Sequence, residues 1–172
     1  CVRVTGDCPL IHPPFIDAQI KALKKFNGDL LWSNKQCPVL VGQGVVSSRA
    51  IITVNQNSKD PDDFEHVGSK YFILHPEEFK YVELILPEKY YTYNYRLTID
   101  EYKDYEFLKN IFNQLWNNNS IHLDDVLNWL EKVEETVIIN QKVQHSVINK
   151  ELKSIRLKFN PELVGSFHWG SA

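Results

Sequence analysis

Two kinds of spacing between hydrophobic residues divide this chain into short strands and amphipathic helices. In residues 12–27, apolar positions recur at helical spacing after a His-Pro-Pro start, and proline is tolerated in the first turn of a helix. Shorter runs such as VRVT and KYVELIL are typical of strands. The pattern predicts strands at 2–5, 29–33, 39–46, 80–86 and 95–99 and helices at 12–27, 60–74, 100–116 and 123–133, and it leaves 48–57 ambiguous between helix and strand.

The order of these elements predicts an α/β fold with a mixed sheet, because strands interleaved with helices are typical of that class. A chain of 172 residues is long enough for one domain with a sizeable core. Residues 1–150 carry the predicted elements. Residues 151–172 do not complete the pattern, and we expect them to be a tail or the start of a following segment.

Composition excludes several classes of function. A net charge of -3 gives no reason to expect nucleic acid or an anionic membrane as a partner. No apolar run approaches the roughly 20 residues that span a bilayer. Three cysteines, an odd number without CxxC spacing, argue against a disulfide scaffold or a structural zinc site. We therefore expect a cytoplasmic protein in a reducing setting.

Two aspartates stand where predicted strands end. Asp7 follows VRVT and a glycine, and Asp100 follows YRLTI. Ligands of open α/β sheets bind beyond the carboxyl ends of the strands. Two carboxylates that meet there repel each other unless a hard cation lies between them, and Mg²⁺ takes one or two carboxylates together with water and phosphate oxygens. The alternative is that both are turn residues, or that Asp100 caps the helix that follows it.

Two neighbours of these aspartates have competing interpretations. Arg96 either pairs with Asp7 or Asp104 as a structural ion pair or holds an anionic substrate. Cys8 stands directly beside Asp7, but no base lies near it in the sequence, which argues against a nucleophile.

The run TGDCPLI at residues 5–11, with Arg3 before it, is the first of several segments that resemble one known family. The others follow in the family's order over about residues 2–150: EHVG at 65–68, HPEEFK at 75–80, RLTID at 96–100 with Asp104 beyond it, and LDDVL at 123–127. These segments are similar to the spore-coat-polysaccharide-type cytidylyltransferases, relatives of the CMP-Kdo and acylneuraminate cytidylyltransferases.

The resemblance implies a Rossmann-like mixed sheet of the nucleotide-diphospho-sugar transferase type. It also implies a reaction in which CTP and a sugar or sugar acid give a CMP-sugar and pyrophosphate, for surface polysaccharide biosynthesis. Asp7 and Asp100 match the acidic positions that hold Mg²⁺ in the relatives, and they would be the catalytic residues. The expected cofactor, Mg²⁺, would neutralise the α-phosphate while the sugar hydroxyl attacks in line.

The sugar is expected to lie over residues 40–46 and near His66, although a lone histidine is often structural. Gln43, between two glycines, would contact the sugar or simply mark a bend at an edge strand. Many relatives carry Asp near that position, so the resemblance leaves the identity of the sugar open.

The family's basic loop of the A-R-x-x-S-x-R-L-P-x-K kind has no counterpart here. We therefore expect residues 1–150 to be the C-terminal portion of a cytidylyltransferase-like domain, because the chain has no Met and begins in a predicted strand. We also expect this segment alone to have little activity, since that loop holds the triphosphate in the family.

Two alternatives belong to other classes of function. The chain would be a degenerate sugar-binding or dimerisation module, or a glycosyltransferase of the same broad fold, which also needs an aspartate at a strand end. Relatives are often homodimers, and the strand and tyrosine-rich run at 80–95 would be the contact between subunits.

Overall fold

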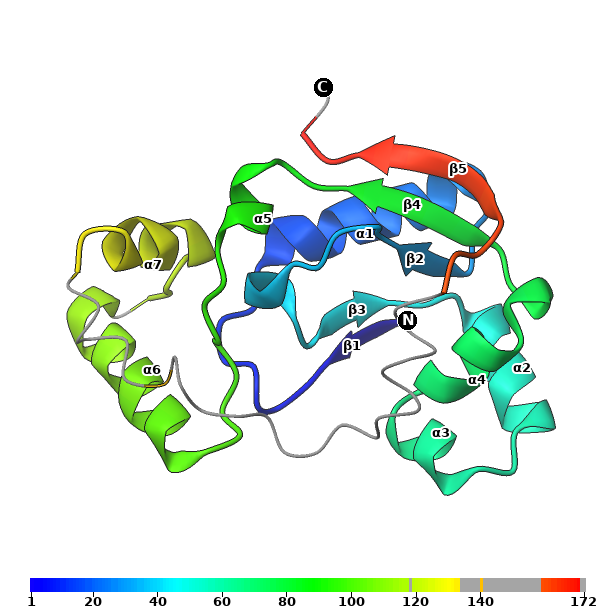
Figure 1. Cartoon of the computed structure of the whole chain (residues 1–172), viewed down its shortest axis with the longest axis horizontal. Coiled ribbons are helices and arrows are strands. Elements are labelled where there is room, and N and C mark those ends of the chain that lie inside the picture. The colour runs from blue at the N-terminus through cyan, green and yellow to red at the C-terminus, as the bar shows by residue number, and fades with distance from the viewer. Residues whose placement is uncertain (118, 134–139, 141–158, 171–172) are drawn as a thin grey trace.

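The computed structural model describes residues 1–117, 119–133, 140 and 159–170 (Figure 1). The strands are β1 (Val2–Val4), β2 (Leu30–Trp32), β3 (Gln43–Val45), β4 (Tyr81–Ile85) and β5 (Leu163–His168). The α-helices are α1 (Pro13–Phe26), α2 (Ser48–Asn57), α3 (Pro61–Glu65), α4 (Ser69–Leu74), α5 (Lys89–Thr92), α6 (Tyr102–Leu115) and α7 (Leu123–Leu130). Two 3₁₀ turns lie at Pro38–Leu40 and Pro76–Glu78. The predicted boundary near residue 150 lies outside the described residues.

The prediction of an α/β fold is confirmed, and the mixed sheet that the sequence predicted is divided into two small sheets, one parallel and one antiparallel. β2, β4 and β5 form a parallel sheet with β4 in the middle, and β1 pairs with β3 in an antiparallel ladder. Because β2 and β5 occupy both edges of β4, this strand has no free edge for the subunit contact expected at 80–95. Tyr90, in the tyrosine-rich run, is buried in the main core.

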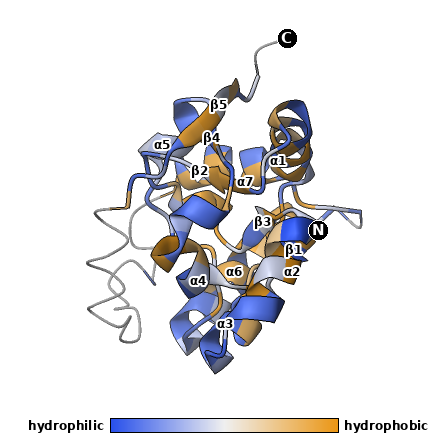
Figure 2. Ribbon diagram, turned by 90° about the vertical axis from the view of Figure 1, so that its right-hand side faces the viewer, coloured by the Kyte–Doolittle hydropathy of each residue, from blue (hydrophilic) through white to orange (hydrophobic). Residues whose placement is uncertain are grey.

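Helix α1 packs against both sheets. Its sequence carries hydrophobic and hydrophilic residues on different sides (Figure 2). Gln19, on its buried side, replaces the missing strand partner of β3, because its amide donates to the Gln43 carbonyl (3.2 Å) and accepts from the Val45 N–H (3.0 Å). Buried backbone groups need such partners. Asn27 ends the helix in the left-handed conformation (φ 48°).

Two predicted elements are different in the structure. The single helix expected at 60–74 is two helices, because Val67 (φ 54°) and Gly68 (φ 77°) turn the chain left-handed between them. His66 therefore ends α3 instead of lying within a helix. The strand expected at 95–99 is irregular backbone, whose Ile99 N–H bonds to a turn of the chain instead of to a strand.

Two further segments are only partly as expected. The β segment expected at 39–46 begins as the 3₁₀ turn, and only Gln43–Val45 pairs as a strand. The ambiguous residues 48–57 form α2, which the Ser47 hydroxyl caps by accepting the Ala50 N–H.

The core consists of two hydrophobic clusters on either side of the sheets. The larger joins α1, β4, α6 and α7, and the smaller lies under α2 and α4. Figure 1 accordingly shows α6 and α7 on one side of the strands and α2 to α4 on the other. Within the described ranges, no helix is long and apolar enough to cross a membrane.

Candidate functional site

Asp7 lies in a tight turn directly after β1. The turn is closed by the Cys8 N–H, which donates to the Thr5 carbonyl (3.2 Å), while the Thr5 N–H donates to the Gly42 carbonyl (2.9 Å). The nearby Thr5 hydroxyl holds the pKa of Asp7 below its usual value, with help from backbone N–H and Cys8, although partial burial opposes this. Asp7 is thus ionised at neutral pH. Within the described residues it forms no ion pair.

Cys8 packs into the protein behind this turn. It is buried, its thiol accepts from the Thr5 hydroxyl (3.1 Å), and it lies 3.6 Å from a carboxylate oxygen of Asp7. Burial raises the pKa of the Cys8 thiol, and the negative charges of Asp7 and Asp100 raise it further. A protonated, buried thiol fits the prediction that Cys8 is not a nucleophile.

Gly42 allows β3 to approach the Asp7 turn closely. Its φ is +78°, and a Cβ atom built there would lie 2.0 Å from the Cys8 sulfur and 2.5 Å from the Thr5 hydroxyl oxygen. Gly44, two residues later and inside β3, has no atom within 4 Å of the corresponding position. The two glycines therefore make a matched pair for testing how tightly the turn is packed.

We expect Gly42→Ala to lower the free energy of unfolding by about 2–4 kcal/mol, the sum of left-handed strain and overpacking. Gly44→Ala should change it by less than about 0.5 kcal/mol. Urea denaturation of both variants measures the difference. Equal stability of the two variants would show that the turn is not packed as described.

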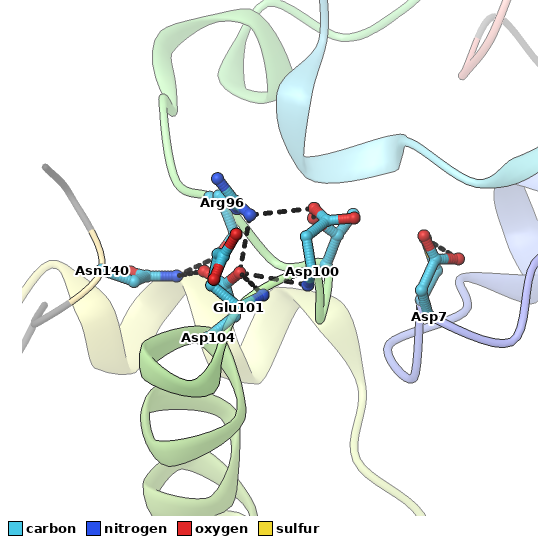
Figure 3. Close-up of polar contacts among 8 residues, drawn as sticks. Asp7, Arg96, Asp100, Glu101, Asp104 and Asn140 are labelled. Carbon is cyan, nitrogen blue, oxygen red and sulfur yellow. Dashed lines mark hydrogen bonds and ion pairs between the residues drawn. The ribbon is translucent and has the colours of Figure 1, made fainter. Parts of the chain in front are cut away.

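The loop that carries Asp100 lies directly against the Asp7 turn. The Ile99 N–H donates to the Asp7 carbonyl oxygen at 2.8 Å, which brings two segments more than ninety residues apart into contact. Figure 3 shows Asp7 and Asp100 on neighbouring loops. Asp100 is 41% exposed, and its bonds from Arg96 (3.0 Å) and the Thr98 hydroxyl (2.8 Å) both end on Oδ2. No described residue donates to its Oδ1, which leaves this oxygen for a ligand as far as the described part of the chain is concerned.

Asp104 organises the Asp100 loop from the first turn of α6. This carboxylate is 0% exposed and accepts four hydrogen bonds. The donors are the backbone N–H groups of Asp100 (3.1 Å) and Glu101 (2.8 Å), the Arg96 guanidinium (2.7 Å) and the Asn140 amide (2.9 Å) (Figure 3). Glu101 is the N-cap of α6 and forms a capping box with Asp104, so the alternative that Asp100 caps this helix is wrong.

Arg96 forms ion pairs with both Asp100 and Asp104. Its side chain is 10% exposed and pairs with Asp104 and Asp100, and no ion pair joins it to Asp7 within the described residues. The ion pair with Asp104 was one of the two alternatives from the sequence. The second ion pair, with Asp100, places the same guanidinium group beside the candidate site.

The donor set around Asp7 and Asp100 fits Mg²⁺. Two carboxylates on adjoining loops are hard oxygen ligands, one of them ionised and without an ion-pair partner in the described residues. The contact between the two loops is therefore compatible with the predicted sharing of one ion by Asp7 and Asp100. Asp100, however, lies on an irregular loop and not at the end of a strand.

Gln43 and His66 lie in a different hollow. This depression of about 310 Å³ is lined by both residues together with Arg3, and neither Asp7 nor Asp100 is among its described lining residues. The Gln43 side-chain carbonyl accepts the His12 N–H (2.8 Å), and its buried Nε2 has no hydrogen-bond partner in the described part of the chain. The lining of this hollow therefore includes one residue with a buried, unpaired amide nitrogen and one cation, Arg3.

His66 is exposed at the end of α3. One of its ring nitrogens lies within 4.8 Å of a carboxylate oxygen of Asp62 and of one of Glu65, two acidic residues of the same helix. The structure thus brings together Asp7, Asp100 and Arg96, and separately Gln43 and His66. Asn140, which completes the Asp104 network, carried no signal in the sequence.

The sequence profile of the family described as "Cytidylyltransferase" matches residues 1–154 of this chain. The chain is 24% identical over 131 residues to the "Spore coat polysaccharide biosynthesis protein SpsF" of Bacillus subtilis (strain 168), which covers 76% of this chain and 54% of that protein. It is 29% identical over 143 residues to the "Uncharacterized protein MJ1063" of Methanocaldococcus jannaschii, covering 83% and 58% respectively. The chain spans just over half the length of both relatives. No solved structure matches it significantly.

Proposed function

Because this chain belongs to the cytidylyltransferase family and is of the spore-coat type, with the α/β fold of the nucleotide-diphospho-sugar transferases, we propose that it carries part of a site that transfers a cytidylyl group. The substrates would be CTP and a sugar or sugar acid, and the products a CMP-sugar and pyrophosphate used for surface polysaccharide. The observation that carries the proposal is the hydrogen bond from Ile99 to Asp7, since it brings the Asp100 loop against the Asp7 turn.

In this reaction a sugar hydroxyl oxygen bonds to the α-phosphorus of CTP. The bond from that phosphorus to the oxygen bridging to the β-phosphorus breaks, pyrophosphate leaves, and the hydroxyl proton is released. The residues that would hold Mg²⁺ are Asp7 and Asp100, and the ion would supply positive charge against the phosphate oxygens. The requirement for Mg²⁺ is proposed together with the reaction.

The protein's own side chains prepare this site before any ligand binds. Asp104 fixes the backbone of Asp100 and Glu101, and Arg96 neutralises part of the charge on Asp100. These bonds are already made, so the site does not have to rearrange when charge develops on the phosphate. The loop that carries Asp100 is thus held in place from its buried side.

Gln43 and His66 are the proposed contacts to substrate oxygens away from the aspartates. The Nε2 of Gln43, which is buried and unpaired among the described residues, would donate to an acceptor oxygen that reaches it, and Arg3 in the same hollow favours an anionic group such as the carboxylate of a sugar acid. Removing the amide with Gln43→Leu should raise the KM for such a substrate and leave kcat nearly unchanged if the contact is equal in ground and transition states.

Pyrophosphate release tests the proposed reaction. The full natural protein, supplied with Mg²⁺ and a panel of sugars and sugar acids, should release pyrophosphate from CTP faster than from ATP, GTP or UTP. Asp7→Asn should reduce kcat/KM by at least about 100-fold, the size typical of losing a group that stabilises transition-state charge. Asp17→Asn, an exposed aspartate on α1, is the matched control and should leave it unchanged.

Two results would contradict the proposal. CTP that binds in the presence of Mg²⁺ but releases no pyrophosphate with any acceptor would favour a glycosyltransferase of the same fold. Absence of any Mg²⁺-dependent CTP binding in calorimetry would favour a degenerate sugar-binding or dimerisation module.

A further inference from the structure

A chain of hydrogen bonds runs from the surface to Gln43 through the buried residue His12. Its outer end is the ion pair between Lys89 on α5 and Asp124 on α7 (2.9 Å), whose side chains are partly exposed. Asp124 also accepts the Tyr90 hydroxyl (2.9 Å), and the oxygen of that hydroxyl lies 3.3 Å from Nε2 of His12. Figure 1 shows α5 between α7 and the start of α1, where His12 lies. The inner end is the His12 backbone N–H, which donates to the Gln43 side-chain carbonyl (2.8 Å).

The chemistry of these groups determines which atom carries each hydrogen. Partial burial raises the pKa of Asp124, but the bonds from Lys89 and Tyr90 outweigh burial and hold this pKa below its usual value. The carboxylate is therefore ionised at neutral pH and can only accept. The Tyr90 hydroxyl has a single hydrogen, which it donates to Asp124, so its oxygen is left to accept. Nε2 of His12 must then be the protonated nitrogen of the ring.

The surroundings of His12 keep its ring neutral. The residue is 6% exposed, and burial is the largest influence on the pKa of His12, which it lowers. The charge of Asp124 acts in the opposite direction, while Lys89 on α5 and His122 before α7 lower the pKa further. A neutral ring with its hydrogen on Nε2 is therefore the state that these neighbours favour near pH 7.

The position of the His12 ring also determines the orientation of the Gln43 amide. The ring contacts Tyr90 on one side and the Trp169 ring on another, with 5.6 Å between the centroids of His12 and Trp169. The His12 carbonyl accepts two backbone N–H groups from the first turn of α1, so the backbone of this residue is fixed as well. Its N–H can only donate, and Gln43 must therefore present Oε1 to it.

We propose that His12 is a positioning residue for Gln43, and that Tyr90 and Asp124 act through His12. The consequence for a substrate rests on the proposed function, since Gln43 is a proposed contact to substrate oxygens. Loss of the Tyr90 hydroxyl would leave the Nε2–H group of His12 buried without its acceptor, and an unmet buried donor is unfavourable enough to displace the ring. Gln43 would then lose the fixed N–H group that holds its amide.

The first test is an NMR measurement that requires no turnover. In the full natural protein, at about pH 7, we expect Nε2 of His12 to be protonated and Nδ1 to be unprotonated. Tyr90→Phe keeps the ring that stacks on Trp169, with 5.0 Å between the centroids, and should shift the side-chain amide signals of Gln43. Tyr105→Phe, at an exposed position of α6, is the matched control and should leave the signals of both residues unchanged.

Asp124→Ala is a second variant, which keeps the test decisive if Tyr90→Phe folds poorly. The aspartate is 43% exposed, so its replacement disturbs the core less than a buried substitution does. Without this carboxylate, the Tyr90 hydroxyl is free to donate to Nε2 of His12. The ring should therefore shift toward the tautomer with its hydrogen on Nδ1, and a ring that keeps its hydrogen on Nε2 as in the natural protein would contradict the action of Asp124 through Tyr90.

The second test is kinetic and uses the best sugar or sugar acid of the panel. Tyr90→Phe should raise its KM at least about threefold and change kcat by less than about twofold, an effect within the range for coupled residues of one network. In a Gln43→Leu background, the same substitution should change the KM by less than about twofold, because the side chain that it acts on is gone. A role of Tyr90 in stability alone would not depend on Gln43.

The outcomes separate this inference from the proposed function. A His12 ring with its hydrogen on Nδ1, Gln43 amide signals that Tyr90→Phe leaves unchanged, or effects of Tyr90→Phe and Gln43→Leu on the KM that simply add would each overturn the inference, even if pyrophosphate is released. A hydrogen on Nε2 together with shifted Gln43 signals in Tyr90→Phe supports the inference, even if CTP is not turned over.

Discussion

Replacing Asp104 with alanine is expected to lower the free energy of unfolding by about 3–5 kcal/mol, the range for breaking a buried ion pair by removing one partner. The carboxylate is 0% exposed, and its loss leaves the N–H groups of Asp100 and Glu101 and the Asn140 amide without their acceptor. Arg96 also loses this ion pair and keeps its bond to Asp100, at the exposed end of the network.

The same variant should weaken the candidate metal site. Asp100 is oriented through the backbone bonds to Asp104, and partners behind a metal ligand typically contribute 10–100-fold in affinity. Glu106→Ala is the matched control, because it removes an exposed carboxylate from the next turn of α6 and should cost less than about 0.5 kcal/mol. Chemical denaturation measures both. A loss below about 1 kcal/mol for Asp104→Ala would show that the network is not as tightly buried as described.

The sequence predicts the fold well where the signals for a helix or strand lie within the segment itself. The helix at Pro13–Phe26 has a proline start, an apolar face and a left-handed Asn at its end, and the strand at Tyr81–Ile85 is a compact apolar run. Both signals are local. Residues 95–99 have the composition of a strand, but the Ile99 N–H bonds to the Asp7 turn and the Arg96 carbonyl accepts from the Asn140 side chain, both elsewhere in the chain. A contact of this kind overrides local propensity.

The candidate site likewise has some features that local sequence signals predict and others that depend on long-range contacts. The position of Asp7 after a strand is readable from VRVTGD, and an ion pair of Arg96 with Asp104 is one of the alternatives that the sequence offers. The buried role of Asn140 is not readable, because it depends on tertiary contact with α6 and the Arg96 loop. The separation between the hollow of Gln43 and His66 and the two aspartates is likewise a property of packing. The sequence could only place the sugar over residues 40–46 and near His66.

We expect Asp7→Asn and Asp100→Asn each to weaken divalent-ion binding at least about tenfold, because each removes one of the two carboxylates that would hold the ion. Asparagine keeps the size of the side chain, so the turn and the loop remain. Asp17→Asn, at an exposed position of α1, serves as the control and should bind the ion normally.

The dependence on pH has a definite sign. Protonation of Asp7 removes a ligand, so affinity falls as the pH drops through the pKa of Asp7 in the folded protein. That pKa lies below the usual value of about 3.9, since the Thr5 hydroxyl and nearby N–H groups stabilise the carboxylate. Ion binding should therefore persist down to about pH 4 as far as Asp7 is concerned.

The most direct test of the account is a titration with Mn²⁺, in place of Mg²⁺, followed by paramagnetic broadening of backbone NMR signals. The account predicts that broadening at low Mn²⁺ centres on both the Asp7 turn and the loop at 98–101, and that Asp7→Asn or Asp100→Asn abolishes it at both places together. Broadening centred on Asp62, Glu65 and His66, or broadening of one loop that survives loss of the other aspartate, would contradict a shared ion between Asp7 and Asp100.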